Sequence, residues 1–241
     1  MFTVSERDRL RDDLVSAADS DPRVVGAALT GSSALGREDR WSDLDFAVSV
    51  DRDMDAVVED WTDLLYACGA VSHLDVQHGA TLFRVFLMAT TLQVDLAFWP
   101  SAEFGASGPA FRLLFGEVND IPKVRPPDRG QLIGLAWLHA LHVRASLARG
   151  RVWQALHLVN TMRDNVMSLR CLRRGLPAVQ GRGLDDLSDA GEFGATLARS
   201  TEPEELLRAF RVLSGLLMLE IEDPQLVRTV RELTRAAAVR P

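Results

Sequence analysis

The fold of this chain is decided by residues 31–46, which read GSSALGREDRWSDLDF. The apolar run 24–30 precedes them and favours a strand that ends at Gly31. A strand that runs into Gly-Ser and a short helix offers free backbone N–H groups and a hydroxyl, which together can hold a phosphate. A glycine at this point lets the backbone approach the phosphate closely. The stretch therefore predicts a phosphate cradle at Gly31 and Ser32.

Two carboxylates follow at the start of a second strand, predicted over 45–50. Asp43 and Asp45 are two residues apart, so the alternation of a strand places both side chains on one face. Leu44 and Phe46 then point into the core on the other face. Two carboxylates this close repel each other unless a cation lies between them, and Mg2+ prefers oxygen ligands. The pair predicts a magnesium site.

A third acid, Asp95, lies in the apolar run 92–99. A carboxylate inside an apolar strand is costly unless it is paired or binds a metal. If this strand neighbours the one that begins near Asp43, the three acids form a two-metal site of the kind that serves nucleotidyl transfer. The alternative is an ion pair between Asp95 and an arginine such as Arg84.

The GS pair at 31–32 and the SDLD motif at 42–45 resemble the signature of the polymerase-beta-like nucleotidyltransferase superfamily. The resemblance extends to Asp95 and so covers most of residues 20–100. It implies that the catalytic metal ligands are Asp43, Asp45 and Asp95. It also implies that Asp95, or an acid from the second half of the chain, helps to deprotonate the acceptor.

The same resemblance implies a nucleotide site. Gly31 and Ser32 are expected to hold the phosphates of ATP, with Ser42 beside them. The expected reaction is Mg2+-dependent transfer of a nucleoside monophosphate, AMP from ATP, to a hydroxyl of a small molecule, with release of pyrophosphate. The small size and helical second half are similar to the branch that modifies antibiotics, the aminoglycoside and lincosamide nucleotidyltransferases.

The fold class expected is α+β. A nucleotidyltransferase domain with a mixed sheet and flanking helices is expected over 1–120, followed by an all-α helical bundle over 129–241, with the active site in the cleft between them. Apolar periodicity predicts helices over 5–18, 53–67, 131–147, 152–172, 185–199, 203–219 and 224–239. It predicts strands over 24–30, 45–50, 71–77, 81–88 and 92–99, the last three as a meander. The first helix is expected to open with a capping box at 5–8.

The charge of the chain is divided unevenly. The formal net charge is −7, but residues 1–128 carry 11 basic and 22 acidic side chains, whereas residues 129–241 carry 16 and 12. The change falls beside the proline-rich segment 120–128, which is typical of a stiff connector between domains.

Residues 129–184 hold nine arginines and one acid, Asp164. Guanidinium groups suit phosphate oxygens, so this segment is expected to face the triphosphate. Arg163 and Arg144 are the arginines predicted to bind the nucleotide. For any single arginine, the alternative is a solvated basic face.

Other function classes are disfavoured. The acidic total argues against a nucleic-acid coat protein. No run of 18 apolar residues predicts a membrane span, and the early charges do not resemble a signal peptide, so a cytoplasmic location is expected. Cys68 and Cys171 have no C-x-x-C partner, and His139 with His142 lacks a third zinc ligand. A homodimer is left open.

Two rival functions remain. One is an antitoxin-type nucleotidyltransferase that modifies a partner protein, against which the long C-terminal half argues. The other is a non-catalytic nucleotide-binding member of the fold, against which the intact set of three aspartates argues.

Overall fold

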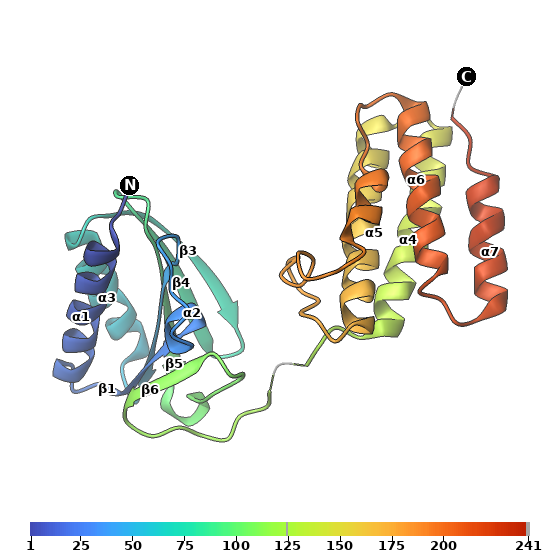
Figure 1. Ribbon diagram of the computed structural model, residues 1–241. Helices are drawn as coiled ribbons and strands as arrows, with labels where there is room; N and C mark the ends of the chain where they lie inside the picture. The colour runs from blue at the N-terminus through green and yellow to red at the C-terminus, as the bar shows by residue number, and fades with distance from the viewer. Residues whose placement is uncertain (124, 240–241) are drawn as a thin grey trace. The chain divides into compact units, whose positions relative to one another are not determined.

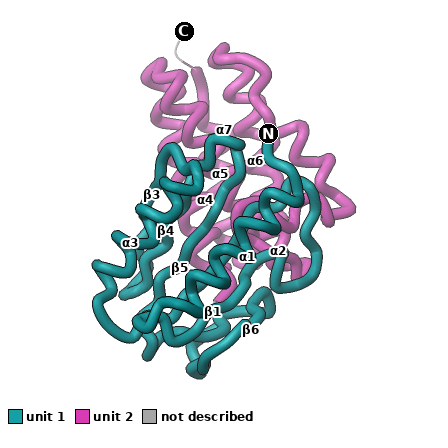
Figure 2. Tube along the Cα trace, turned by 90° about the vertical axis from the view of Figure 1, so that its left-hand side faces the viewer, with its two compact units in different colours: residues 1–124 teal, residues 125–241 magenta. Residues whose placement is uncertain are grey.

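The computed structural model describes residues 1–123 and 125–239. The chain forms two compact units, residues 1–124 and 125–241 (Figures 1 and 2). Val124 of the expected connector, and Arg240 and Pro241 of the expected second domain, lie outside the described residues.

Unit 1 is a mixed sheet with helices. Its elements are α1 (Val4–Ser20), β1 (Val24–Thr30), the single turn α2 (Gly31–Ala34), β2 (Leu44–Val50), α3 (Met54–Ala67), β3 (Ala70–His78), β4 (Thr81–Met88), β5 (Gln93–Pro100), the 3-10 turn η1 (Ser101–Glu103) and β6 (Phe111–Phe115). The strand order is β3-β4-β5-β2-β1-β6. Strands β2 and β5 are parallel and the other pairs are antiparallel. The predicted meander β3-β4-β5 is confirmed.

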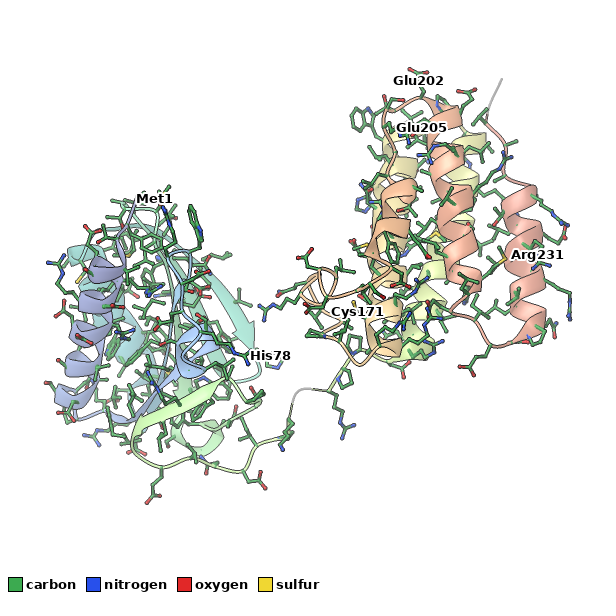
Figure 3. All side chains as sticks on the ribbon, in the orientation of Figure 1. Met1, His78, Cys171, Glu202, Glu205 and Arg231 are labelled. Carbon is green, nitrogen blue, oxygen red and sulfur yellow. The ribbon has the colours of Figure 1, made fainter. Side chains whose placement is uncertain are left out.

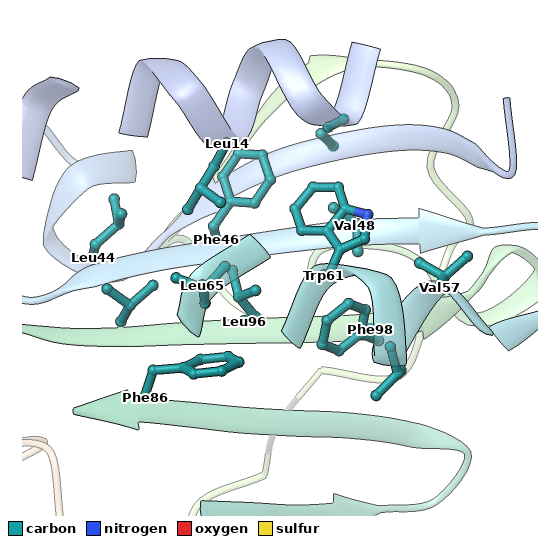
Figure 4. Packing of buried hydrophobic residues seen from close by; sticks show 14 of the residues in the cluster. Leu14, Leu44, Phe46, Val48, Val57, Trp61, Leu65, Phe86, Leu96 and Phe98 are labelled. Atoms are coloured by element: carbon teal, nitrogen blue, oxygen red, sulfur yellow. The ribbon is translucent and has the colours of Figure 1, made fainter. Parts of the chain in front are cut away.

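One face of the sheet carries the main core of unit 1. Leu14 of α1 and Trp61 of α3 pack there against Phe46 and Phe98, which are almost completely buried (Figure 4). Trp61 stacks on Phe46 and meets Phe98 edge-on. Both long helices of the unit therefore cover this face, as their apolar stripes require.

The opposite face has a smaller core. Ala28, Ala47 and Ala97 lie there on three neighbouring strands, under Phe104 from the segment after η1. No long helix of unit 1 contributes to this cluster among the described residues. The face that carries these alanines is also the face of the predicted metal ligands, because Asp45 and Asp95 lie two residues before Ala47 and Ala97.

Two details of unit 1 differ from the sequence-based expectation. The capping box of α1 is formed by Thr3 and Glu6, not by residues 5–8: the Thr3 hydroxyl accepts from the Glu6 N–H, and the Glu6 carboxylate accepts from the Thr3 N–H. Strand β6 was not expected. It pairs with β1, placing Leu113 opposite Ala28, and becomes the edge of the sheet.

Unit 2 is a helical bundle. Its elements are α4 (Arg129–Ala148), α5 (Val152–Arg173), the 3-10 segment η2 (Ala190–Thr196), α6 (Pro203–Met218) and α7 (Pro224–Arg235). A sheet unit followed by a helical unit confirms the α+β class. The helix expected over 185–199 is wrong: the segment forms turns and 3-10 structure, and Gly191 and Gly194 lower its helix propensity. Among the described residues, no helix is both long and apolar enough to cross a membrane.

Candidate metal centre

The parallel pairing of β2 and β5 brings the three predicted acids together. Asp45 lies directly opposite Asp95 in this register, and Asp43 precedes β2 on the same face. Carboxylate oxygens from all three side chains lie within 4.8 Å of one another. In the part of the chain that the structure describes, they form the one group of three acidic, histidine or cysteine side chains close enough to share a metal ion.

The side chains of residues 43–46 alternate between buried and half-buried, as the sequence motif predicts. Leu44 and Phe46 are 0% and 1% exposed in the main core, whereas Asp43 and Asp45 are half-buried on the other face. The alternation of a strand thus fixes two carboxylates on one face by burying their apolar neighbours on the other. Buried anchors of this kind hold the acids with little freedom to move apart.

Asp95 is the most perturbed acid of the group. Burial raises the pKa of the Asp95 carboxyl, and the negative charge of Asp43 raises it further, while hydrogen bonds from Gln93 lower it. The Gln93 amide donates to both carboxylate oxygens, at 2.9 and 3.1 Å. Arg84 is not its partner, because that guanidinium binds Asp75 and Thr62. The ion-pair alternative for Asp95 is therefore wrong.

Gly31 lies against the carboxylates. Its φ is +60°, and a Cβ at this position would lie 1.9 Å from Oδ2 of Asp45. Glycine is required here both by the left-handed backbone and by the space that the carboxylate occupies. The neighbouring Ser32 hydroxyl is buried and makes no hydrogen bond among the described residues. A buried hydroxyl without a partner is costly unless a ligand completes it.

The loop before Asp43 is held by a buried arginine that the sequence did not suggest. Arg7 of α1 is 2% exposed, and its Nη1 donates to the backbone carbonyls of Asp39 and Ser42, at 2.7 and 3.2 Å. The Ser42 hydroxyl donates to the Asp39 carboxylate and accepts from the Asp39 N–H. Ser42 therefore closes the turn that leads into Asp43.

Sequence reasoning also missed two side chains beside the acids. Gln93 lies two residues before Asp95 on the same strand face, so the alternation of a strand could have identified it. Trp41 is 66% exposed and stacks under the Arg40 guanidinium, 4.3 Å from the ring centre. It lines a pocket of about 310 Å3 together with Asp43 and Gln93. An exposed tryptophan next to an acid motif is the signal that identifies it.

The predicted arginines lie in unit 2. Arg163 is buried and donates to the hydroxyl and the carbonyl of Thr196 and to the side chain of Asn160. These contacts tie α5 to η2, and the phosphate contact expected of Arg163 stays a prediction. Arg144 is half-buried on α4 and makes no hydrogen bond or ion pair with the described side chains.

The residues present fit a divalent metal. Three carboxylates supply oxygen ligands in a half-buried setting, and Mg2+ is held by one or two carboxylates together with phosphate oxygens. The unpartnered Ser32 hydroxyl, next to Gly31, is a donor that a phosphate oxygen can complete. Without a cation, three acids this close would repel one another, and the raised pKa of Asp95 reflects part of that cost.

Comparisons with known proteins find matches among solved structures. No protein-family model and no curated protein sequence matches this chain. Its structure is similar to the crystal structure of an aminoglycoside 6-adenyltransferase from Bacillus subtilis, with a TM-score of 0.42 and 15% sequence identity over 96% of this chain and 98% of that chain. Three aspartates on the parallel strands of a mixed sheet, behind a Gly-Ser turn, are typical of the polymerase-beta-like nucleotidyltransferase fold.

Proposed function

We propose that this chain is a Mg2+-dependent nucleotidyltransferase, which moves a nucleoside monophosphate, AMP from ATP, to a hydroxyl of a small molecule and releases pyrophosphate. The observation that carries the proposal is the convergence of Asp43, Asp45 and Asp95 within 4.8 Å. Nucleotidyl transfer needs such a cluster, because charge on the attacking and leaving oxygens must be neutralised together. A cytoplasmic setting, where ATP and Mg2+ are available, is part of the proposal.

Each acid has a role in this proposal. Asp43 and Asp45 hold the metal from β2, and Asp95 holds it from β5. Bound Mg2+ supplies positive charge to the triphosphate. Asp95 also takes the proton of the acceptor hydroxyl, because its carboxylate lies beside the two that hold the metal. Gln93 orients Asp95 through its two hydrogen bonds.

The phosphates are proposed to bind beside the acids. Gly31 turns the backbone into the short helix beside Asp45, and the Ser32 hydroxyl donates to a phosphate oxygen. Ser42 positions Asp43 through the turn that it closes. From unit 2, Arg144 is the proposed phosphate-binding cation, since no described partner occupies it. Arg163 is assigned to this site by the sequence alone.

Transfer of label from ATP tests the proposal. The full chain is incubated with Mg2+, ATP labelled at the α-phosphate, and a panel of aminoglycosides, lincosamides and cell metabolites. Asp43→Asn and Asp45→Asn are expected to abolish label transfer and pyrophosphate release and to leave the fold intact, because the amide loses the charge that holds the metal. Asp51→Asn is the matched control. This residue follows the other end of β2 and is expected to keep normal turnover.

Each outcome decides between the candidates. Label on a small molecule supports the proposal, and label on a polypeptide supports the antitoxin-type alternative. Tight ATP binding with no transfer to any acceptor or protein supports a non-catalytic member of the fold. Normal turnover in Asp43→Asn or Asp45→Asn contradicts the metal-site assignment itself.

A further inference from the structure

A large pocket lies within unit 1 on the face of the sheet that carries the three aspartates. Its volume is about 790 Å3, within the range that binds small molecules. Ala47 and Ala97 line it, each two residues beyond Asp45 or Asp95 on the same strand. Two residues along a strand span about 7 Å, so the pocket begins at about that distance from the carboxylates. Thr30, the residue before Gly31, also lines it.

The pocket is open because small side chains form its floor and aromatic side chains form its walls. Ala47 and Ala97 are register partners on β2 and β5 and bring no bulk to the floor. Phe83 and Trp99 stand edge-on to each other as one wall, with ring centroids 6.2 Å apart. Phe111 packs against the buried Phe104 and forms a second wall, with ring centroids 5.6 Å apart. Half-buried aromatic walls of this kind bind flat apolar groups.

The charges of the pocket exclude one class of acceptor. Among the described residues that line it, the ionisable side chains are Glu103 and His78, the latter at the end of β3 (Figure 3). A polycationic amino sugar needs a carboxylate for each ammonium group that it buries. The one acid that lines the pocket cannot pair with several ammonium groups, whereas a neutral ring needs no carboxylate.

We propose that the acceptor is a neutral compound with an aromatic or fused-ring body, which fills this pocket, and a hydroxyl about 7 Å away that reaches the three aspartates. This inference rests on the proposed nucleotidyl transfer and narrows its acceptor class. The acceptor oxygen forms a bond to the α-phosphorus of ATP, and the bond from that phosphorus to the β-phosphate oxygen breaks. Pyrophosphate leaves with the electron pair, and the hydroxyl proton passes to a carboxylate.

Binding of 2-naphthaleneethanol to the full chain, without nucleotide or metal, tests the pocket. This probe joins a fused ring to a hydroxyl through a two-carbon arm. Val76→Trp and Ala110→Phe each place a bulky ring in the pocket, from β3 and from the segment before β6. Both variants are expected to raise the dissociation constant of the probe at least about tenfold.

Two controls accompany these variants. Val71→Trp makes the same substitution on the same strand, at an exposed valine outside the pocket, and is expected to bind the probe as the wild type does. Asp45→Asn is expected to bind the probe normally and to transfer no AMP to it, which separates occupancy of the pocket from catalysis. Circular dichroism and thermal unfolding of each variant confirm that it folds.

The results separate a failure of the pocket from a failure of the proposed function. Probe binding that both pocket variants weaken, together with AMP transfer to the probe by the wild type, supports the inference. Probe binding without transfer in the presence of ATP and Mg2+ contradicts nucleotidyl transfer to this acceptor class. The inference is overturned if the wild type does not bind the probe, if adenosine displaces it, if Val76→Trp leaves transfer to the probe unchanged, or if the wild type transfers AMP to an aminoglycoside such as kanamycin.

Discussion

At the scale of single residues, Gly31 couples the backbone to the candidate metal centre. Its positive φ turns the chain out of β1, and the absence of a Cβ leaves room for the Asp45 carboxylate. Glycine at this position therefore serves two purposes, whereas the turn at Gly36 requires only the first. Gly36, in the loop that follows, has a similar φ of +64°, and no atom lies within 4 Å of the point that a Cβ would occupy there.

This difference predicts the effect of Gly31→Ala. Both Gly31→Ala and the matched control Gly36→Ala are expected to lower the free energy of unfolding by about 1 kcal/mol, because alanine is strained at positive φ. Only Gly31→Ala displaces the Asp45 carboxylate, and a misplaced catalytic group costs on the order of 100-fold in rate. Chemical denaturation and label transfer measure the two effects. Equal losses of activity in the two variants would contradict the assigned role of Gly31.

At the scale of elements, the junction of α1, β1 and α3 is held by one carboxylate. Asp21 caps the C-terminal end of α1 and accepts hydrogen bonds from the Arg23 guanidinium and from the Trp61 indole of α3. The side-chain hydrogen bond from Arg23 is the main reason that the pKa of Asp21 falls to about 2, against an ordinary 3.8. The side chain is 11% exposed. The charged form is therefore stabilised by folding.

This pKa gives the stability of unit 1 a defined pH dependence. The contribution of Asp21 is fully present above about pH 4 and is lost as the pH falls towards about 2, with a size of about 2 kcal/mol. Asp21→Asn is expected to lower the free energy of unfolding by that amount at pH 7, and the difference is expected to shrink at pH 2.5. Asp60→Asn is the control, because its more exposed carboxylate pairs with the same Arg23. If Asp21→Asn lowers the free energy of unfolding by the same amount at pH 2.5 and at pH 7, the stabilising role of the Asp21 charge is contradicted.

The elements also show where sequence reasoning succeeds and where it stops. Strands β1 and β4 were predicted to the residue, because short turn segments bound them and their apolar runs are unambiguous. The meeting of Asp45 and Asp95 was predictable because an acid in an apolar strand needs a partner. Strand β6 was not, because five residues carry too little pattern and its partner β1 lies more than 80 positions earlier in the chain.

At the scale of the whole molecule, the local charge of residues 129–184 proved misleading. Arg170, one of the nine arginines of this segment, is 1% exposed and donates to Glu220, Asp189 and Glu192. All three acids come from later in the chain, so a charge count over residues 129–184 includes the arginines without their partners. Glu220 is fully buried at the end of α6 and also pairs with Arg173. Four of the nine arginines of this segment, Arg129, Arg170, Arg173 and Arg174, are therefore paired with acids within unit 2.

The buried pair predicts the effect of Glu220→Gln. Removing the Glu220 charge leaves the buried Arg170 guanidinium with Asp189 and Glu192 but without its one fully buried partner, which costs about 3 kcal/mol. Glu222→Gln is the control: its carboxylate is 93% exposed, 3.9 Å from Arg129, and its loss is expected to cost under about 0.5 kcal/mol. Hydrogen exchange is expected to rise in α5 and α6 and to stay unchanged in the strands of unit 1. Equal effects of the two variants would show that Arg170 does not depend on Glu220.

The central claim, that three carboxylates form one metal centre, is tested most directly by Mn2+ binding to the full chain. Electron paramagnetic resonance of free Mn2+ gives the dissociation constant for the wild type, for the single variants Asp43→Asn, Asp45→Asn and Asp95→Asn, and for the Asp51→Asn control. The account predicts that each of the three site variants weakens Mn2+ binding at least about tenfold and that Asp51→Asn does not. Mn2+ affinities that are the same in all five proteins would contradict it.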